Sequence, residues 1–126
     1  MEAALLARLR AAGTLAGARV NWDLRPQNDP LPAVVLSIVS DARPLHLKGP
    51  EARRRTRVNA DCWGASALEA TRLAIQVIGA AREPATVQGV RFGVTRTDGG
   101  QSFVETQDGQ TIFRRSIDLL VWHEGE

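Results

Sequence analysis

The residues that most often carry chemistry are few and widely spaced in this chain. The sequence has two histidines, His46 and His123, and one cysteine, Cys62. These residues are too few for a four-ligand structural zinc site, and a single cysteine forms no intramolecular disulfide. His46 is expected in a hairpin tip and His123 at a frayed strand end, so we interpret both as solvated. No metal and no cofactor is therefore expected.

The other candidates for catalysis are equally isolated. Cys62 falls among small apolar residues, which indicates a buried hydrophobic side chain rather than a nucleophile. Asp61 and Asp118 take outward strand positions, but acid/base chemistry needs a cleft around paired carboxylates, and nothing in the sequence predicts one. The glycines at 13 and 17 lack the Gly-Lys-Ser/Thr ending of a phosphate-binding loop. We therefore expect no enzyme.

Arginines make the one dense charge feature, in which Arg53, Arg54 and Arg55 are consecutive and Arg57 follows. Such a run is either a contact surface for an acidic partner or for phosphates, or a solvated edge that blocks aggregation. Alternation puts Arg53, Arg55 and Arg57 on one side of a strand, with about 7 Å between neighbours. No aromatic residue interleaves the run, and the formal net charge is only +2. We therefore expect these arginines to bind protein carboxylates rather than DNA.

Two tryptophans, Trp63 and Trp122, also fall on outward positions of expected strands. A polar face that carries two large aromatic side chains is not expected to be fully exposed to solvent. Either another subunit covers them, or a loop of the same chain does, for which residues 98–109 are the candidate. Both interpretations remain open at this stage, although the first favours a component of an assembly.

The elements that position these residues belong to one domain over residues 1–126. The chain is 44% hydrophobic and 24% charged, which is typical of one soluble domain. Apolar residues at helical spacing predict helices over 2–12 and 66–82, the second opened by a capping box of Ser66 and Glu69. Turns are expected at 98–100 and 108–109. The expected strands are residues 18–22, 33–40, 55–63, 87–97 and 111–123.

This order predicts an α+β domain in which two helices pack on one face of a largely antiparallel or mixed sheet. Residues 43–54 have little that could be buried, so they are expected to form a projecting hairpin arm with Leu45 and Lys48 among its contact residues. No stretch approaches the roughly 20 apolar residues of a membrane span, and the N-terminus lacks the apolar run of a signal peptide. The protein is therefore expected in a cytoplasm, without a membrane partner.

The pattern of the whole chain resembles the tail completion, or tail terminator, proteins of long-tailed phages and of phage-derived particles such as gene transfer agents. The resemblance rests on a short N-terminal helix, a proline-rich approach to an apolar strand, an alanine-rich helix and a closing strand. The segments that carry it are 25–27 (RPQ), 31–35 (LPAVV), 57–63 (RVNADCW) and 118–123 (DLLVWH).

The resemblance implies a structural virion protein that forms a ring, of six subunits, at the head-proximal end of the tail tube. Such a ring stops tube polymerisation and helps to join the tail to the head. The implied partners are further copies of the chain, the tail tube protein and a neck or head-completion protein, while DNA passes through without sequence-specific binding. Assembly would take place in the host cytoplasm. A neck or head-closure protein is the nearest competing class, followed by a small nucleic-acid-binding accessory domain.

Overall fold

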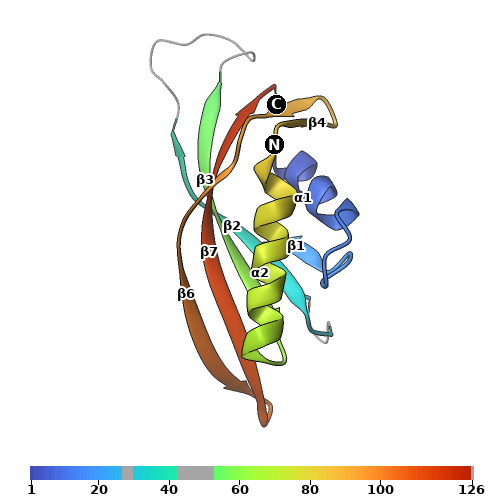
Figure 1. Cartoon of the computed structure of the whole chain (residues 1–126), viewed down its shortest axis with the longest axis vertical. Coiled ribbons are helices and arrows are strands. Elements are labelled where there is room, and N and C mark those ends of the chain that lie inside the picture. Colours follow the sequence, from blue (N-terminus) through green and yellow to red (C-terminus); the bar gives the residue numbers. More distant parts are fainter. Residues whose placement is uncertain (27–29, 43–52, 126) are drawn as a thin grey trace.

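The structure, a computed structural model, describes residues 1–26, 30–42 and 53–125 (Figure 1). Leu45, Lys48 and most of the expected hairpin arm lie outside these residues, as does His46. The first half of the chain contains α1 (Glu2–Ala11), β1 (Val20–Trp22), β2 (Ala33–Ala42) and β3 (Arg54–Gly64). The second half contains α2 (Ala67–Arg82), β4 (Ala85–Val87), β5 (Val90–Phe92), β6 (Arg96–Gln107) and β7 (Gln110–Glu124).

The strands form one mixed sheet of seven strands in the order β1-β2-β3-β7-β5-β4, with β6 also paired to β7. Strands β1 and β2 are parallel, and every other pair is antiparallel. The last strand, β7, is the centre of the sheet, because β3 pairs with one of its edges while β6 and β5 share the other. The α+β class is as the sequence predicts, although the curled sheet is a larger part of the domain than expected (Figure 1).

Local sequence explains both helices. Helix α1 ends just before Gly13, whose φ of +71° is a left-handed conformation that glycine adopts without steric cost. Helix α2 begins with the predicted capping box: the Glu69 amide donates to Ser66 Oγ at 3.1 Å, and Glu69 Oε1 accepts from the Ala65 amide at 3.0 Å. Helix α2 packs against β3 and β7, and α1 packs against α2, β1 and β4.

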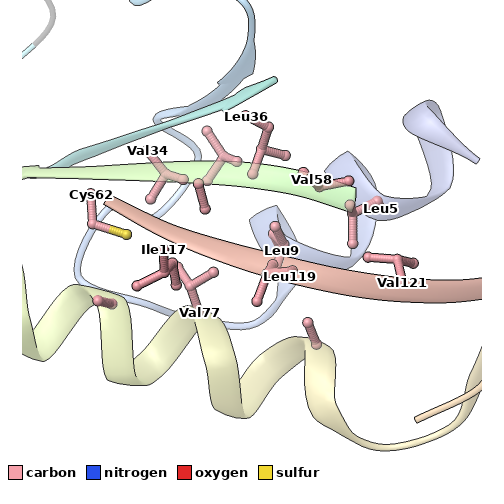
Figure 2. Close-up of a cluster of buried hydrophobic side chains, with 14 of the residues drawn as sticks. Leu5, Leu9, Val34, Leu36, Val58, Cys62, Val77, Ile117, Leu119 and Val121 are labelled. Atoms are coloured by element: carbon pink, nitrogen blue, oxygen red, sulfur yellow. The ribbon is translucent and has the colours of Figure 1, made fainter. Parts of the chain in front are cut away.

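The core fills the space between these helices and the inward positions of β2, β3 and β7 (Figure 2). The side chains drawn there include Leu5, Leu9, Val34, Leu36, Val58, Cys62, Val77, Ile117, Leu119 and Val121. As predicted, the alternation of β3 puts Thr56, Val58, Ala60 and Cys62 inside. The apolar face of α2 is mostly as predicted, but Leu73 is fully buried there while Ala67 is exposed.

The predictions for residues 85–107 are wrong in detail. Instead of one strand over 87–97, the structure has a short hairpin of β4 and β5 that turns at Gln88 and Gly89, with φ of +50° and +80°. Instead of a turn at 98–100, β6 is continuous, and Asp98 with Gly99 forms a bulge between the Thr97 and Gly100 pairs to β7. The pairing of β6 along β7 therefore overrides a local turn sequence.

The prediction for His123 is also wrong. Its side chain is 2% exposed, and its Nε2 lies 2.8 Å from Oγ1 of Thr56, which is buried beside it. The reason is the alternation of β7, in which His123 has the same parity as the buried Leu119 and Val121. Since β5 pairs with β7 at Phe92 and His123, the end of the last strand is held in the sheet rather than frayed.

The hairpin of β6 and β7 extends beyond the sheet at one end of the molecule (Figure 1). Its turn is at Asp108 and Gly109, as predicted, and both residues have positive φ, +49° and +77°. The pairing of β3 with β7 stops at Gly64 and Phe113, so the hairpin beyond that pair has no β3 beside it. Within the described part of the chain, no helix has the length and apolar character to span a membrane.

Candidate interaction surface

The outward positions of β3, β7 and β6 form one polar and aromatic surface, here called the outer face, on the side of the sheet turned away from the core. The alternation of β3 supplies Arg55, Arg57, Asn59, Asp61 and Trp63 to this face. The register places their counterparts opposite: Trp122 beside Arg55, Asp118 beside Asn59, and Arg114 beside Trp63. On the far side of β7, Phe103 of β6 is opposite Arg114.

At one end of the outer face, Arg114 lies between two aromatic side chains. Its guanidinium carbon is 4.3 Å from the ring centre of Phe103 and 5.2 Å from that of Trp63. The same guanidinium forms ion pairs with Asp61 at 3.5 Å and Glu105 at 3.3 Å. One side chain of β7 is thus tied to both neighbouring strands, and it supports the base of the projecting hairpin.

In the middle of the outer face, Arg57 is bound by two carboxylates of its own chain. Its Nη1 lies 2.8 Å from Asp98 and 3.2 Å from Asp118. These hydrogen bonds raise the pKa of Arg57 above its ordinary value. Asn59 completes the cluster by donating to Asp118 at 3.0 Å and to Ser116 at 2.8 Å.

At the other end, two arginines cover Trp122. The guanidinium carbons of Arg53 and Arg55 lie 5.4 and 5.6 Å from its ring centre. Arg53 also pairs with Glu124 at 3.7 Å. Trp63 is covered in a similar way by Arg25, 5.5 Å away, as well as by Arg114. Both tryptophans are half-buried beside arginines of their own chain. Residues 98–107 belong to strand β6 rather than to the expected loop.

Arg54 points to the opposite side of β3 from the other predicted arginines. It lines a pocket with Thr56, His123 and Ile38, next to the start of α1. The predicted site therefore divides: Arg53, Arg55, Arg57 and both tryptophans share the outer face, while Arg54 does not. No set of three or more histidine, cysteine, aspartate or glutamate side chains among the described residues is arranged to hold a metal ion.

Cys62 has the environment of a structural residue, as predicted. It is fully buried in the core, and this burial, together with the nearby Asp61 carboxylate, raises the pKa of its thiol to about 12. Burial therefore favours the protonated thiol at neutral pH, which is the form expected of a residue that packs in the core.

Sequence reasoning missed several residues of the outer face. Arg25, Phe103 and Asp98 come from segments in which the sequence predicts loops or turns, and Arg114 is a further residue of this face. The alternation of β7 predicts that Arg114 is on the same face as Trp122, but only the registers of β7 with β3 and β6 bring Trp63 and Phe103 beside it.

Comparisons with known proteins give one informative result. No family model matches the chain, and no curated protein matches it. Among solved structures, a chain from the virion of a native gene transfer agent particle has a similar fold, with a TM-score of 0.67 and 18% sequence identity. The match covers 99% of this chain and 95% of that chain. The two chains therefore share one fold over almost their whole length.

Proposed function

We propose that this chain is a structural virion protein of a phage-derived particle, and that within the particle it is the tail terminator. In this role it forms a ring at the head-proximal end of the tail tube, stops tube polymerisation and helps to join the tail to the head. The observation that carries the proposal is the likeness in fold to a gene transfer agent virion chain, at a TM-score of 0.67 over 99% of this chain. The sequence resemblance adds the specific role.

The outer face supports a role in assembly. Trp63 and Trp122 are large aromatic side chains on an outward surface, and Arg55 beside Trp122 remains exposed. Tryptophan and arginine are the residue types enriched where proteins bind each other. We propose Arg53, Arg55, Arg57, Trp63 and Trp122 of this face as contact residues. We also propose Arg54, on the opposite side of β3, and Leu45 and Lys48, in the segment between β2 and β3.

The charge arrangement favours a protein partner over DNA. Arg57 and Arg114 each bind two carboxylates of their own chain, and Arg53 binds a fifth carboxylate, that of Glu124. Guanidinium groups that are already paired have less to gain from phosphates. A ring through which DNA slides is also better served by a surface that does not retain it.

The test is direct imaging of the purified chain, combined with its removal from particles. We expect sedimentation to give a hexamer and negative-stain electron microscopy to give a ring with a central hole. Particles made without the chain should have tails of uncontrolled length. A monomer that is absent from purified particles would overturn the proposal. Tails of normal length that fail to attach to heads would assign the chain to the neck, and salt-dependent retention of duplex DNA would assign it to nucleic-acid binding.

A further inference from the structure

Among the described residues, two long strands of the sheet, β6 and β2, each have an outer edge that is unpaired along all or part of its length. Strand β6 pairs with β7 along one edge, and within residues 1–26, 30–42 and 53–125 no strand pairs with its other edge. At the opposite end of the sheet, β1 pairs with β2 only from Val34 to Leu36. The stretch of β2 that follows, from Ile38 on, has no β1 partner. One sheet thus offers two docking edges, one at each end.

Both edges carry adjacent apolar side chains that are exposed. Phe103 and Val104 of β6 are 37% and 65% exposed, and Ile38 and Val39 of β2 are 41% and 56% exposed. Since successive residues of a strand point to opposite faces, β6 is apolar on both faces at this position. An edge of this kind is a template for pairing with another strand.

The backbone of β6 is suited to such pairing. The turn at Asp108 and Gly109 has two residues, so Gln107 and Gln110 next to it form a hydrogen-bonded pair. Hydrogen-bonded and non-hydrogen-bonded pairs alternate along an antiparallel ladder. The N–H and C=O groups of Val104 and Ser102 consequently point away from β7, toward the open edge.

Each edge also contains a β-bulge, which limits where another strand can pair with it. In β6, Asp98 and Gly99 form the bulge described above. In β2, the register to β3 shifts between Ile38 and Ser40, which leaves Val39 without a partner on β3. Bulges interrupt the regular spacing of the ladder, so a strand that docks on either edge can pair only over the short stretch beside the bulge. The edges are therefore built for a defined contact rather than for open aggregation.

We infer that the open edge of β6, over residues 100–107, docks against the open part of β2 in a second copy of this chain. Both halves of the contact are on this chain, at opposite ends of one sheet, and both are apolar. The strands β2, β3, β7 and β6 alternate in direction, so β2 of the next copy would run antiparallel to β6. A head-to-tail contact of this type closes into a ring when its rotation permits. The inference rests on the proposed function, since it names the surface by which ring subunits bind each other.

The test compares two substitutions at equally exposed apolar residues. Val104→Lys places a charge on the docking edge, and Ile75→Lys, at a position on α2 that is 63% exposed against 65% for Val104, is the matched control. We expect Val104→Lys to weaken self-association by about tenfold or more in sedimentation experiments, because a charged side chain would be desolvated in the contact. Ile75→Lys should associate like the unmodified chain. Circular dichroism checks that both variants are folded.

Cross-linking identifies the partner edge. A mixture of Val104→Cys and Ile38→Cys chains should give a mixed disulfide dimer, whereas either variant alone should give little, and the buried Cys62 should not react. A chain that stays monomeric, an unimpaired Val104→Lys variant, or Val104→Cys chains that cross-link to each other as readily would each overturn the inference.

The two proposals fail in distinguishable ways. Tails of normal length made with the Val104→Lys variant would overturn the docking edge and leave the terminator role standing. Open chains of cross-linked subunits that never form a ring would support the docking edge and overturn the terminator role.

Discussion

The guanidinium of Arg57 lies 2.8 Å from the carboxylate of Asp98, an ion pair that joins β3 to the bulge of β6 across the intervening strand β7. Asp118 of β7 binds the same nitrogen at 3.2 Å, so one arginine holds three strands. The extra residue of the bulge is what brings Asp98 to this position. A segment whose sequence predicts a turn thus forms a strand, and the bulge in that strand positions the Asp98 carboxylate beside Arg57.

The first prediction concerns this cluster. Arg57→Ala should lower the free energy of unfolding, because it removes two charge-assisted hydrogen bonds, to Asp98 and Asp118. Arg55→Ala is the control on the same strand face: among the described residues no carboxylate forms an ion pair with Arg55, and only its exposed contact with Trp122 is lost, so stability should fall by less than in Arg57→Ala. Urea unfolding of both variants and of Asp98→Ala measures the coupling. An additive double variant of Arg57 and Asp98 would contradict the assignment.

The arrangement also changes how charge reversal should be used to test assembly. Arg57→Glu would place a third carboxylate beside Asp98 and Asp118, and would destabilise the monomer through repulsion. Arg55→Glu alone is the cleaner probe, since Arg55 is exposed beside Trp122. We expect it to impair ring formation while the thermal midpoint of the monomer is unchanged. Normal rings from this variant would remove Arg55 from the contact surface.

A second prediction concerns the aromatic sandwich, in which the guanidinium of Arg114 lies between the rings of Phe103 and Trp63. Arg114→Gln should lower the free energy of unfolding by about 1 to 2 kcal/mol, because both cation–π contacts and two ion pairs are lost. Fluorescence of Trp63 should change as well, since the guanidinium leaves its ring. Arg115→Gln, at the next residue, is the control: its guanidinium donates to Ser102 at 3.0 Å in an exposed position. Equal effects of the two substitutions would show that the sandwich contributes no stability of its own.

Local patterns predicted the elements that depend on local physics. The capping box of α2, the alternation of β3 and the turn at Asp108 and Gly109 each follow from a few neighbouring residues. The bulge of β6 and the burial of His123 do not, because both depend on which strands lie beside them in the sheet. The alternation within each strand predicts the correct face for Trp63 and Trp122. The arginines that cover these two side chains do not follow from alternation, because they come from other strands or loops.

A third prediction tests the buried hydrogen bond at the end of β3. Thr56→Val keeps the shape of the side chain but removes the 2.8 Å bond to His123. The free energy of unfolding should fall by about 1 to 3 kcal/mol, the cost of leaving a buried polar group without this partner. Thr56→Ser, which retains the hydroxyl, should recover most of the loss. If the Thr56→Val and Thr56→Ser variants are equally stable, the hydrogen bond makes no net contribution to the free energy of unfolding.

A fourth prediction concerns pH. The pKa of the Cys62 thiol is raised to about 12 from 9.0, so the fold favours the protonated form. This contribution is fully present below pH 9 and is lost as the pH rises from 9 toward 12. Between pH 8 and pH 10 the loss should be about 1.4 kcal/mol. The chain has no tyrosine and only one lysine, so few other side chains titrate in this range.

Urea unfolding of Cys62→Ala at the same two pH values is the control for this effect. The substitution lowers stability at both values through the cavity it leaves, but the additional loss at pH 10 should disappear. An identical pH dependence in the two proteins would show that the thiol is not its source.

The central position of β7 has a consequence for how the chain folds as it is made. All of the strands that pair with β7 precede it in the chain, and the contact between Arg57 and Asp118 spans 61 residues. The sheet therefore cannot close on the ribosome until β7 has been synthesised, whatever follows it. Until then the apolar sides of β3 and α2 have no central strand to cover them. Translation of β7 is thus the committing event of folding, and a pause just before it would lengthen the interval in which the nascent chain depends on chaperones.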